Sequence, residues 1–350
     1  MVARLVAALC ALLMVSACGG WPSRPPKPTK PPVSTTSTVP PSTPTVTPTS
    51  TTVQPTTVQP TSTTQPPSTT TTTGTTTQPP RTGCSAVPSA CGYPDATNTG
   101  YKPTGASLLP VHNGAYTITA PGVYDRLNIN GCVVVRARDV TIRRSLLSGC
   151  DGWFALHLYP EAANFTVEDT EIDGKGLVRD SGFTEDGTGP VTIRRVYMRN
   201  VQDGLRVGEN LLLEDSFVTD LSRCGICHND TVQSAGAVNV TLRHNTLVNL
   251  AGTVQPEGGM NAVVRIATEQ GPVTGFTVEN NLLVGGNFAV QVRSQGHGAP
   301  QGVKVLNNRI GRGTTPDGQP YPRWGAPFDY PDVPVVFSGN VWDDDGSPAR

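Results

Sequence analysis

The densest group of residues capable of chemistry runs from His228 to Gln233, where an imidazole and a carboxylate stand within six residues. A histidine beside acids can act as a general base, and Asp203 and Asp230 together could bind a cation such as Ca²⁺. Asp203 precedes Arg206 by three residues, as Asp230 precedes Gln233, so we expect both carboxylates to lie near each other. In the alternative interpretation both aspartates cap turns and His228 is a turn residue.

Polar side chains also recur at the third position of seven short segments whose central residue is aliphatic. An aliphatic centre points into the core of a strand layer, so its neighbours point outward. Stacked segments would form one column: Arg136, His157, Arg179, Arg206, Gln233, Arg265 and Gln291, with Arg293 one outward step beyond. Arginines in a row suit repeated carboxylate or sulfate groups, which they bind bidentately. The alternative is a solvated face whose arginines pair with Asp203, Asp230 and Glu269.

These patterns define the candidate site. The candidate catalytic residues are His228, Asp230, Arg206 and Arg265. The candidate substrate-binding residues are Arg136, His157, Arg179, Gln233, Gln291 and Arg293. The candidate metal ligands are Asp203 and Asp230, with Ca²⁺ as the possible ion and no other cofactor expected.

An internal repeat would position this column. Eight copies of an apolar–x–apolar segment, with a further apolar residue at the eighth position, start 20 to 36 residues apart. The starts are Val140, Phe165, Val191, Leu211, Val240, Phe276, Val303 and Val335. Periods in this range are typical of a solenoid, and the apolar spacing of two is that of a strand. Four asparagines at one place in their copies predict a hydrogen-bonded ladder: Asn245, Asn281, Asn308 and Asn340.

The repeat resembles that of right-handed parallel β-helix proteins, the architecture of pectate lyases and their relatives, over about residues 128–342. The resemblance implies an all-β fold, a single-stranded right-handed parallel β-helix (solenoid) of about eight coils, and a polysaccharide as substrate. It carries over no catalytic residue. Gly296-His297-Gly298 resembles the Gly-His-Gly of polygalacturonases, but it follows a strand and lacks the aspartates that should precede it. The Asp-Pro-His motif of alginate epimerases is absent from the sequence.

The N-terminal region predicts export. Arg4 and an apolar run over residues 5–15 lead to Val15-Ser-Ala-Cys18, which resembles the lipobox of bacterial lipoproteins. Residues 1–17 would then be a lipoprotein signal peptide and Cys18 the lipidated N-terminus, unless the site is an ordinary cleavage site or an uncleaved anchor. Residues 18–82, rich in proline and threonine, are expected to be a disordered linker that forms a stalk. Residues 83–127 should cap the open end of the core, and residues 343–350 form a tail.

Charge and cysteine use fit an exported domain. The first 82 residues hold five of the 26 basic groups and none of the 27 acidic ones, so the remainder is acidic and unsuited to nucleic acid. Six cysteines remain after Cys10 and Cys18, and proximity favours the disulfides Cys84–Cys91, Cys132–Cys150 and Cys224–Cys227.

The segment Cys224-Gly-Ile-Cys227-His228 also matches the pattern of covalent haem attachment. It leads into a tight coil that leaves no room for a porphyrin, and no second axial ligand is evident. We therefore favour a disulfide or two packed thiols over haem.

Three functions fit these patterns. The first is a lyase that cleaves an acidic polysaccharide by β-elimination, in which arginine or Ca²⁺ neutralises the uronate carboxylate and a base removes the adjacent proton. The second is a non-catalytic glycan-binding or wall-associated module. The third is a glycoside hydrolase or epimerase; a hydrolase needs two carboxylates facing one bond. In each case we expect a monomer, held at the outer face of the cell membrane by its lipid and facing the cell wall or the extracellular space.

Replacing Cys18 tests the anchor. If Cys18 is lipidated, Cys18→Ser should release the protein from the membrane fraction, because the thiol that carries the lipid is gone. Immunoblots of membrane and medium fractions measure this. A variant that stays in the membrane fraction would show that uncleaved residues 5–17 are the anchor instead.

Overall fold

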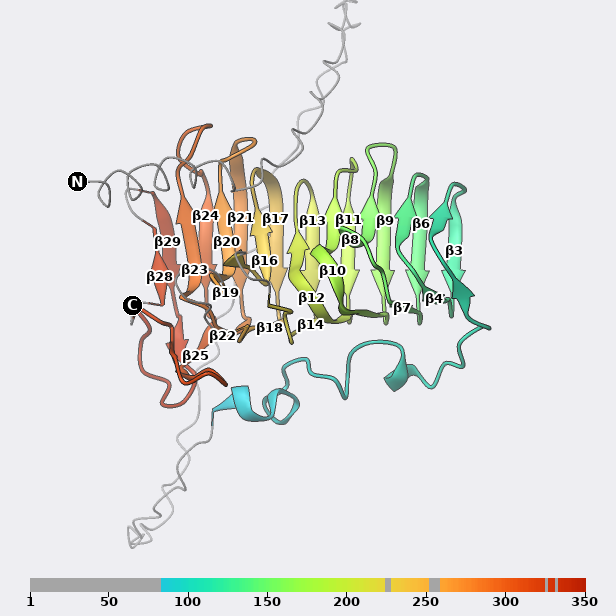
Figure 1. Ribbon diagram of the computed structural model, residues 1–350. Helices are drawn as coiled ribbons and strands as arrows, with labels where there is room; N and C mark the ends of the chain where they lie inside the picture. The colour runs from blue at the N-terminus through green and yellow to red at the C-terminus, as the bar shows by residue number, and fades with distance from the viewer. Residues whose placement is uncertain (1–82, 224–227, 252–258, 325–326, 331–332) are drawn as a thin grey trace, which may run out of the picture. The chain divides into compact units, whose positions relative to one another are not determined.

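The computed structural model describes residues 83–223, 228–251, 259–324, 327–330 and 333–350. Almost all regular structure in these ranges is strand, and the strands stack in parallel along one axis (Figure 1). The predicted all-β parallel β-helix is therefore confirmed. Within the described ranges, no helix is both long enough and apolar enough to cross a membrane.

Three strands per coil build three faces. Face 1 is a nine-stranded sheet made of β3 (Gly122–Asp125), β6 (Arg138–Arg143), β9 (Ala163–Glu168), β11 (Val191–Arg194), β13 (Leu211–Glu214), β17 (Ala237–Arg243), β21 (Val273–Glu279), β24 (Val303–Leu306) and β29 (Val335–Ser338). Its nine strands mean nine coils, one more than the repeat predicts. The additional coil contains β3, which has Gly122 at the register position of Val140, so its sequence lacks the apolar spacing.

Faces 2 and 3 continue each coil. Face 2 contains β1 (His112–Asn113), β4 (Asn128–Asn130), β7 (Leu146–Ser148), the starts of β10 (Glu171–Glu185) and β12 (Tyr197–Arg206), β14 (Phe217–Val218), β18 (Thr246–Asn249), β22 (Leu282–Gly285), β25 (Arg309–Gly311) and β30 (Val341–Trp342). Face 3 contains β2 (Tyr116–Ile118), β5 (Val133–Val135), β8 (Phe154–Leu158), the ends of β10 and β12, β16 (Val232–Ser234), β20 (Ala262–Ala267), β23 (Phe288–Arg293) and β28 (Phe328–Asp329). The inward side chains of all three faces form one apolar core.

A left-handed residue turns each coil from face 1 into face 2. The nine residues have φ between 48° and 69°: Arg126, Arg144, Asp169, Arg195, Asp215, His244, Asn280, Asn307 and Gly339. This region of backbone space is small for any residue with a side chain, and Asn, Asp and His tolerate it better than most. A single such residue therefore makes a sharp corner at the same place in every coil.

The predicted asparagine ladder follows this corner and is confirmed. The Asn281 Oδ1 atom accepts hydrogen bonds from the backbone N–H and the Nδ2 atom of Asn245, both at 2.9 Å. Asn281 in turn donates its own two groups to Asn308 Oδ1 at 2.9 and 3.0 Å, and Asn308 does the same with Asn340. The amides are buried, so losing one would leave donors unpaired at about 1–3 kcal/mol for each group.

Residues 83–111 do not cap the end of the core, so that prediction is wrong. They form a strap, defined here as residues 83–111, which includes the 3₁₀ turns η1 (Cys84–Ala86), η2 (Pro88–Cys91) and η3 (Lys102–Thr104). The strap runs along the side of the coils from the C-terminal end to the N-terminal end (Figure 1). Its successive contacts meet earlier and earlier coils: Ser85 with Asp343, Tyr93 with His244, Gly100 with Arg195 and Leu109 with Arg126.

The start of the β-helix moves accordingly. Strands β1, β2 and β3 lie within residues 112–125 and pair with β4, β5 and β6, so the first coil begins at His112 rather than near residue 128. The sequence shows that this segment precedes the repeat, but it does not show whether the segment covers the end of the coils or runs along their side. Only contacts between residues far apart in the chain could show that it lies along the side.

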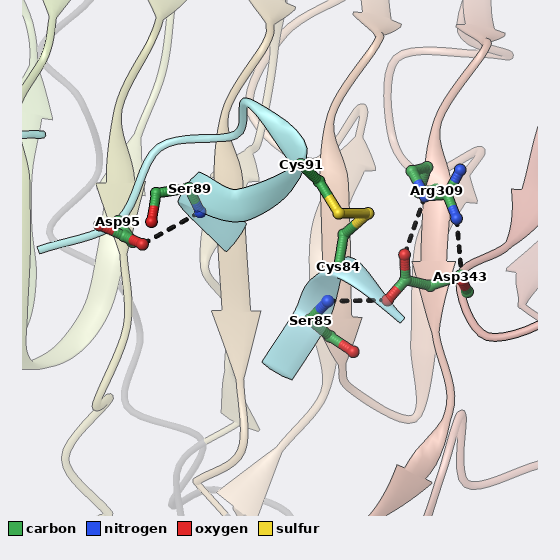
Figure 2. The surroundings of a disulfide bond; sticks show 7 residues. All are labelled: Cys84, Ser85, Ser89, Cys91, Asp95, Arg309 and Asp343. Atoms are coloured by element: carbon green, nitrogen blue, oxygen red, sulfur yellow. Dashed lines mark hydrogen bonds and ion pairs between the residues drawn. A yellow bond between two sulfur atoms is a disulfide. The ribbon is translucent and has the colours of Figure 1, made fainter. Parts of the chain in front are cut away.

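Two of the three predicted disulfides are confirmed, Cys84–Cys91 and Cys132–Cys150. Cys224 and Cys227 lie outside the described residues. Figure 2 shows the first disulfide beside the point where the strap meets the last coil. There Asp343 accepts hydrogen bonds from the Ser85 backbone N–H at 2.8 Å and from Arg309 Nε at 2.8 Å. Burial disfavours the Asp343 carboxylate, but the hydrogen bonds from Arg309 and Ser85 outweigh it and hold its pKa below the ordinary value.

Asp343→Asn should release this end of the strap. The neutral amide keeps an acceptor but loses the ion pair with Arg309, and a hydrogen bond to a charged group contributes about 1.5–3 kcal/mol. Hydrogen exchange of residues 84–95 should then be roughly ten-fold faster or more. Because the folded pKa of Asp343 is lowered, wild type should hold the strap above the unfolded pKa and lose it as pH falls through the folded value.

The matched control is Asp344→Asn. Asp344 is half exposed and pairs with Arg312 rather than with a residue of the strap, so its replacement should leave exchange at residues 84–95 unchanged. Equal exchange in wild type and Asp343→Asn would show that the disulfide and apolar contacts hold the strap by themselves.

Candidate functional site

The predicted column exists on face 3, with a changed membership. Strand register places one residue per coil in line, and we call these residues the polar column: His157, Thr184, Arg206, Gln233, Arg265, Gln291 and Asp329. The sequence therefore predicted five of its seven members. Arg293 lies one outward step beyond Gln291, as expected, in register with Ala267.

Arg136 and Arg179 are not in the polar column, which corrects the prediction. Val134 holds the register of His157, so Arg136 lies two residues further along its strand. A shift of two residues keeps every side chain on the same side of the sheet, so the apolar pattern cannot detect it. Thr184 holds the level assigned to Arg179, because β10 shifts register between Asp173 and Ser181.

Each of the arginines named as candidates has an acidic partner. The pairs are Arg206 with Asp180 at 3.6 Å, Arg265 with Glu269 at 2.5 Å, Arg293 with Asp329, Arg136 with Glu161 at 3.1 Å, and Arg179 with Asp151 at 2.6 Å. The pairing of Arg265 with Glu269 was the expectation of the alternative interpretation. The column is therefore a row of ion pairs and amides, with far less net positive charge than the arginines alone suggest.

The polar column is also more buried than an outer strand face should be. The Arg206 and Arg265 side chains are 17% and 15% exposed, and Gln233 is 4% exposed. Arg206 lies two levels from His157, yet its guanidinium carbon is 5.8 Å from the ring centre of Phe154 on the strand of His157. Its side chain must therefore extend towards the intervening coil, where Thr184 is fully buried.

Asp203 and Asp230 precede Arg206 and Gln233 of the polar column by three residues. They lie on adjacent coils and close to each other, as predicted. Asp203 Oδ1 accepts the backbone N–H of Asp230 at 3.0 Å, and its Oδ2 accepts Gln233 Nε2. Asp230 Oδ1 accepts two hydrogen bonds at 2.9 Å, from Asn261 Nδ2 and from the Ala262 backbone N–H. Among the described residues Asp230 Oδ2 accepts no hydrogen bond. One Asp230 oxygen is thus fixed while the other remains available for a proton.

Burial changes the protonation of both acids. Burial raises the pKa of Asp203 well above its ordinary value, and the neighbouring Asp230 carboxylate raises it further. Burial also raises the pKa of Asp230 to about 7, although Arg265 and the hydrogen bonds from Ala262 and Asn261 oppose the change. A group that titrates near neutral pH can both take and return a proton, which is the requirement for general acid–base catalysis.

These acids do not fit a Ca²⁺ site. Three of their four oxygens already accept N–H groups, and a calcium ion needs six to eight oxygen ligands. Within the described residues no group of three or more His, Cys, Asp and Glu side chains could hold a metal ion. Asp203 is instead a structural link that fixes Gln233 and the backbone of Asp230.

His228 lies apart from the polar column. It is exposed on β15 (His228–Asn229), which pairs with β19 (Gly259–Met260) in a separate two-stranded sheet. Its neighbour Asn229 is buried and donates to the carbonyl groups of Gln202 and Ser222, so the backbone here is anchored to other turns. Cys224 and Cys227, which with His228 suggested haem attachment, lie outside the described residues.

Sequence reasoning missed two features. Asn261 and Asp180 contact Asp230 and Arg206, yet Asn261 precedes β20, Asp180 lies within the long β10, and neither carries a repeat signal. A hollow of about 560 Å³ opens where the turns after face 2 meet the β26–β27 hairpin (Gly313–Thr314 and Pro320–Tyr321), and it contains none of the predicted site residues. Its lining is drawn from four separate segments of the chain, so no contiguous motif could have revealed it.

Comparison with known proteins gives no relative. No protein-family model, no curated protein and no solved structure matches the chain. Function therefore has to be argued from the residues of the site.

Asp230→Asn tests the buried acid. Folding raises the pKa of Asp230 to about 7, so the folded state binds more protons than the unfolded state between the two pKa values. Wild type should therefore lose stability as pH rises from about 4 to about 7. Asparagine removes this loss and should make the variant more stable than wild type at pH 8. Urea unfolding at pH 4.5, 6 and 8 measures it.

The control is Asp344→Asn, which removes a half-exposed carboxylate whose partner, Arg312, keeps its charge over this pH range. It should reproduce the pH profile of wild type. A wild-type stability that does not fall between pH 4.5 and pH 8 would show that Asp230 is ionised throughout and lacks the raised pKa.

Proposed function

We propose that face 3 binds an acidic polysaccharide and cleaves it by β-elimination, with Asp230 as the base. The observation that carries the proposal is Asp230: a buried carboxyl with a pKa of about 7, one oxygen fixed by two donors and the other without a hydrogen-bond partner among the described residues. It lies between Arg206 and Arg265, on the coil between theirs.

The proposed reaction uses each group once. Arg265, assisted by Arg206, hydrogen-bonds the uronate carboxylate and so acidifies the proton on the adjacent carbon. Asp230 Oδ2 takes that proton, the electron pair forms a carbon–carbon double bond, and the glycosidic C–O bond breaks. The departing oxygen takes a proton from water. Gln233, held by Asp203, supports the sugar hydroxyls between the two arginines.

The burial of Asp230 favours a second candidate function, that of a non-catalytic glycan-binding module. Asp230 is 3% exposed and both arginines already have carboxylate partners. A face of this kind can bind sugar through amides and guanidinium groups without reaching the reacting carbon. The two candidates predict the same binding residues and differ only in product formation.

The setting of this activity is part of the proposal. We place the protein among the pectate-lyase-like β-helix proteins, supported by nine stacked coils and the asparagine ladder. Export and anchoring through Cys18 at the outer face of the membrane are supported by two disulfides, which persist in oxidising compartments.

Incubating the full-length protein with a panel of polyuronates tests cleavage. Unsaturated products should appear as ultraviolet absorbance, with a rate that rises with pH through about 7, since the base must be ionised. Arg265→Ala should reduce binding about ten-fold or more, because a bidentate arginine–carboxylate contact contributes on the order of 1–3 kcal/mol. The loss should shrink as salt is added.

Arg243→Ala is the control. Arg243 is an arginine of face 1 that pairs with Glu214 at 2.5 Å, so its loss removes an equal charge from a face without the proposed site. Binding without unsaturated products at any pH would leave only the glycan-binding module. Unchanged binding in Arg265→Ala would remove face 3 from both candidates.

A further inference from the structure

An aromatic cluster surrounds His157, the first residue of the polar column. We define it as Trp153, Phe154, His157 and Tyr159, all on or beside β8. We propose that this cluster is a separate subsite that stacks against a sugar ring of the bound polysaccharide. It rests on the proposed function in one respect: the ring belongs to the same glycan chain that Arg206 and Arg265 hold.

Trp153 is the exposed member. Its relative exposure is 64%, so most of the indole ring is open to solvent and accessible to a ligand. Apolar C–H groups on one face of a sugar ring can lie against the negative face of an indole, while the sugar hydroxyls stay in water. A flat ligand with one apolar face and a polar rim is therefore the kind of partner that the exposed ring of Trp153 fits.

The backbone holds Trp153 firmly. Its carbonyl accepts the Ser181 N–H at 3.2 Å, and the carbonyl of the preceding Gly152 accepts the Arg179 N–H at 2.9 Å. The Cys132–Cys150 disulfide lies directly against Gly152, where a Cβ atom would be 2.9 Å from Cys132 Sγ. A surface that is already rigid loses little entropy on binding, which distinguishes a built platform from a mobile loop.

The other three rings contact one another in series along and just after β8, which begins at the residue following Trp153. His157 contacts Phe154 edge-on at 4.7 Å and Tyr159 at 4.4 Å between ring centres. A cation lies at each side, with the Arg136 guanidinium 3.7 Å from the centre of Tyr159 and the Arg206 guanidinium 5.8 Å from that of Phe154. The Arg206 contact joins the cluster to the polar column. Arg136 and Arg179, which the sequence assigned to substrate binding, thus flank the cluster instead of standing in the column.

The distance between the aromatic cluster and Arg265 determines how long a glycan must be to contact both. Four register steps separate His157 from Arg265. At about 4.8 Å per step the two groups are roughly 19 Å apart, which is about four sugar units of an extended chain. A disaccharide or trisaccharide held by Arg265 would not reach Trp153. A chain of six units would cover both places.

Chain-length dependence tests the subsite. Calorimetric titration of the full-length protein with a trisaccharide and a hexasaccharide of a bound polyuronate compares wild type with Trp153→Ala. The variant should bind the hexasaccharide about ten-fold more weakly, while its trisaccharide affinity stays within roughly two-fold of wild type. Trp153→Phe, which keeps a ring, should recover part of the lost affinity.

Trp324→Ala is the matched control, since Trp324 is 62% exposed, nearly as much as Trp153, but does not belong to the cluster. It should bind both ligands as wild type does. Equal hexasaccharide binding in Trp153→Ala and wild type overturns the inference, as does an equal loss for both ligands, which would mean that Trp153 only supports the column. Wild type that binds neither ligand overturns it as well.

The two proposals fail separately. If Arg265→Ala is neutral or no unsaturated product forms, the lyase proposal fails, and a loss confined to the hexasaccharide in Trp153→Ala still establishes the subsite. If Arg265→Ala weakens both ligands and Trp153→Ala weakens neither, the proposed function stands and the subsite does not.

Discussion

The corner between face 1 and face 2 is the constraint on which the rest of the molecule depends. One left-handed residue per coil turns the chain, and in seven of the nine coils the next residue supplies a side chain that hydrogen-bonds a neighbouring coil. Leu127 and Val196 take this place in the other two coils, and their backbone N–H groups donate to Ser145 and Ser216. Where this residue is asparagine, it satisfies backbone groups that the turn would otherwise bury unpaired. Ser145, Thr170 and Ser216 take this place in earlier coils and use a hydroxyl for the same purpose. Coils of 20 to 36 residues can therefore share one register while their loops vary.

That register explains the candidate site. Residues that share a register position on adjacent coils of face 3 are about 30 residues apart in the chain but only one strand spacing apart in space. Stacking partly buries these acids and arginines, and a buried charge is costly unless it is paired, so they form ion pairs with one another. The same closeness removes water from Asp203 and Asp230 and raises both pKa values. A structural consequence of stacking polar residues thus produces the group best suited to move a proton near neutral pH.

The strap connects distant coils in a fold whose other contacts are mainly between neighbouring coils. In a solenoid each coil contacts mainly the coils next to it, so stability is close to a sum of local terms. Residues 83–111 contact coils from the last to the first and tie them together. Its first residues lie beside Asp343, so the chain enters the folded domain at the C-terminal end of the β-helix (Figure 2).

The sequence alone determined the architecture, because apolar spacing and an asparagine repeated at one place recur in enough copies to be read without a structure. It also predicted Arg206, Gln233, Arg265, Gln291 and the proximity of Asp203 to Asp230, since these follow directly from stacking. It could not place Arg136, because a shift of two residues preserves the apolar pattern. It could not show that the arginines are paired and buried, nor that Asp230 titrates near neutral pH, because burial and charge partners come from loops and strands of other coils. Nor could it reveal the course of the strap or the link between Arg206 and the aromatic cluster, which join residues through contacts that no local pattern encodes.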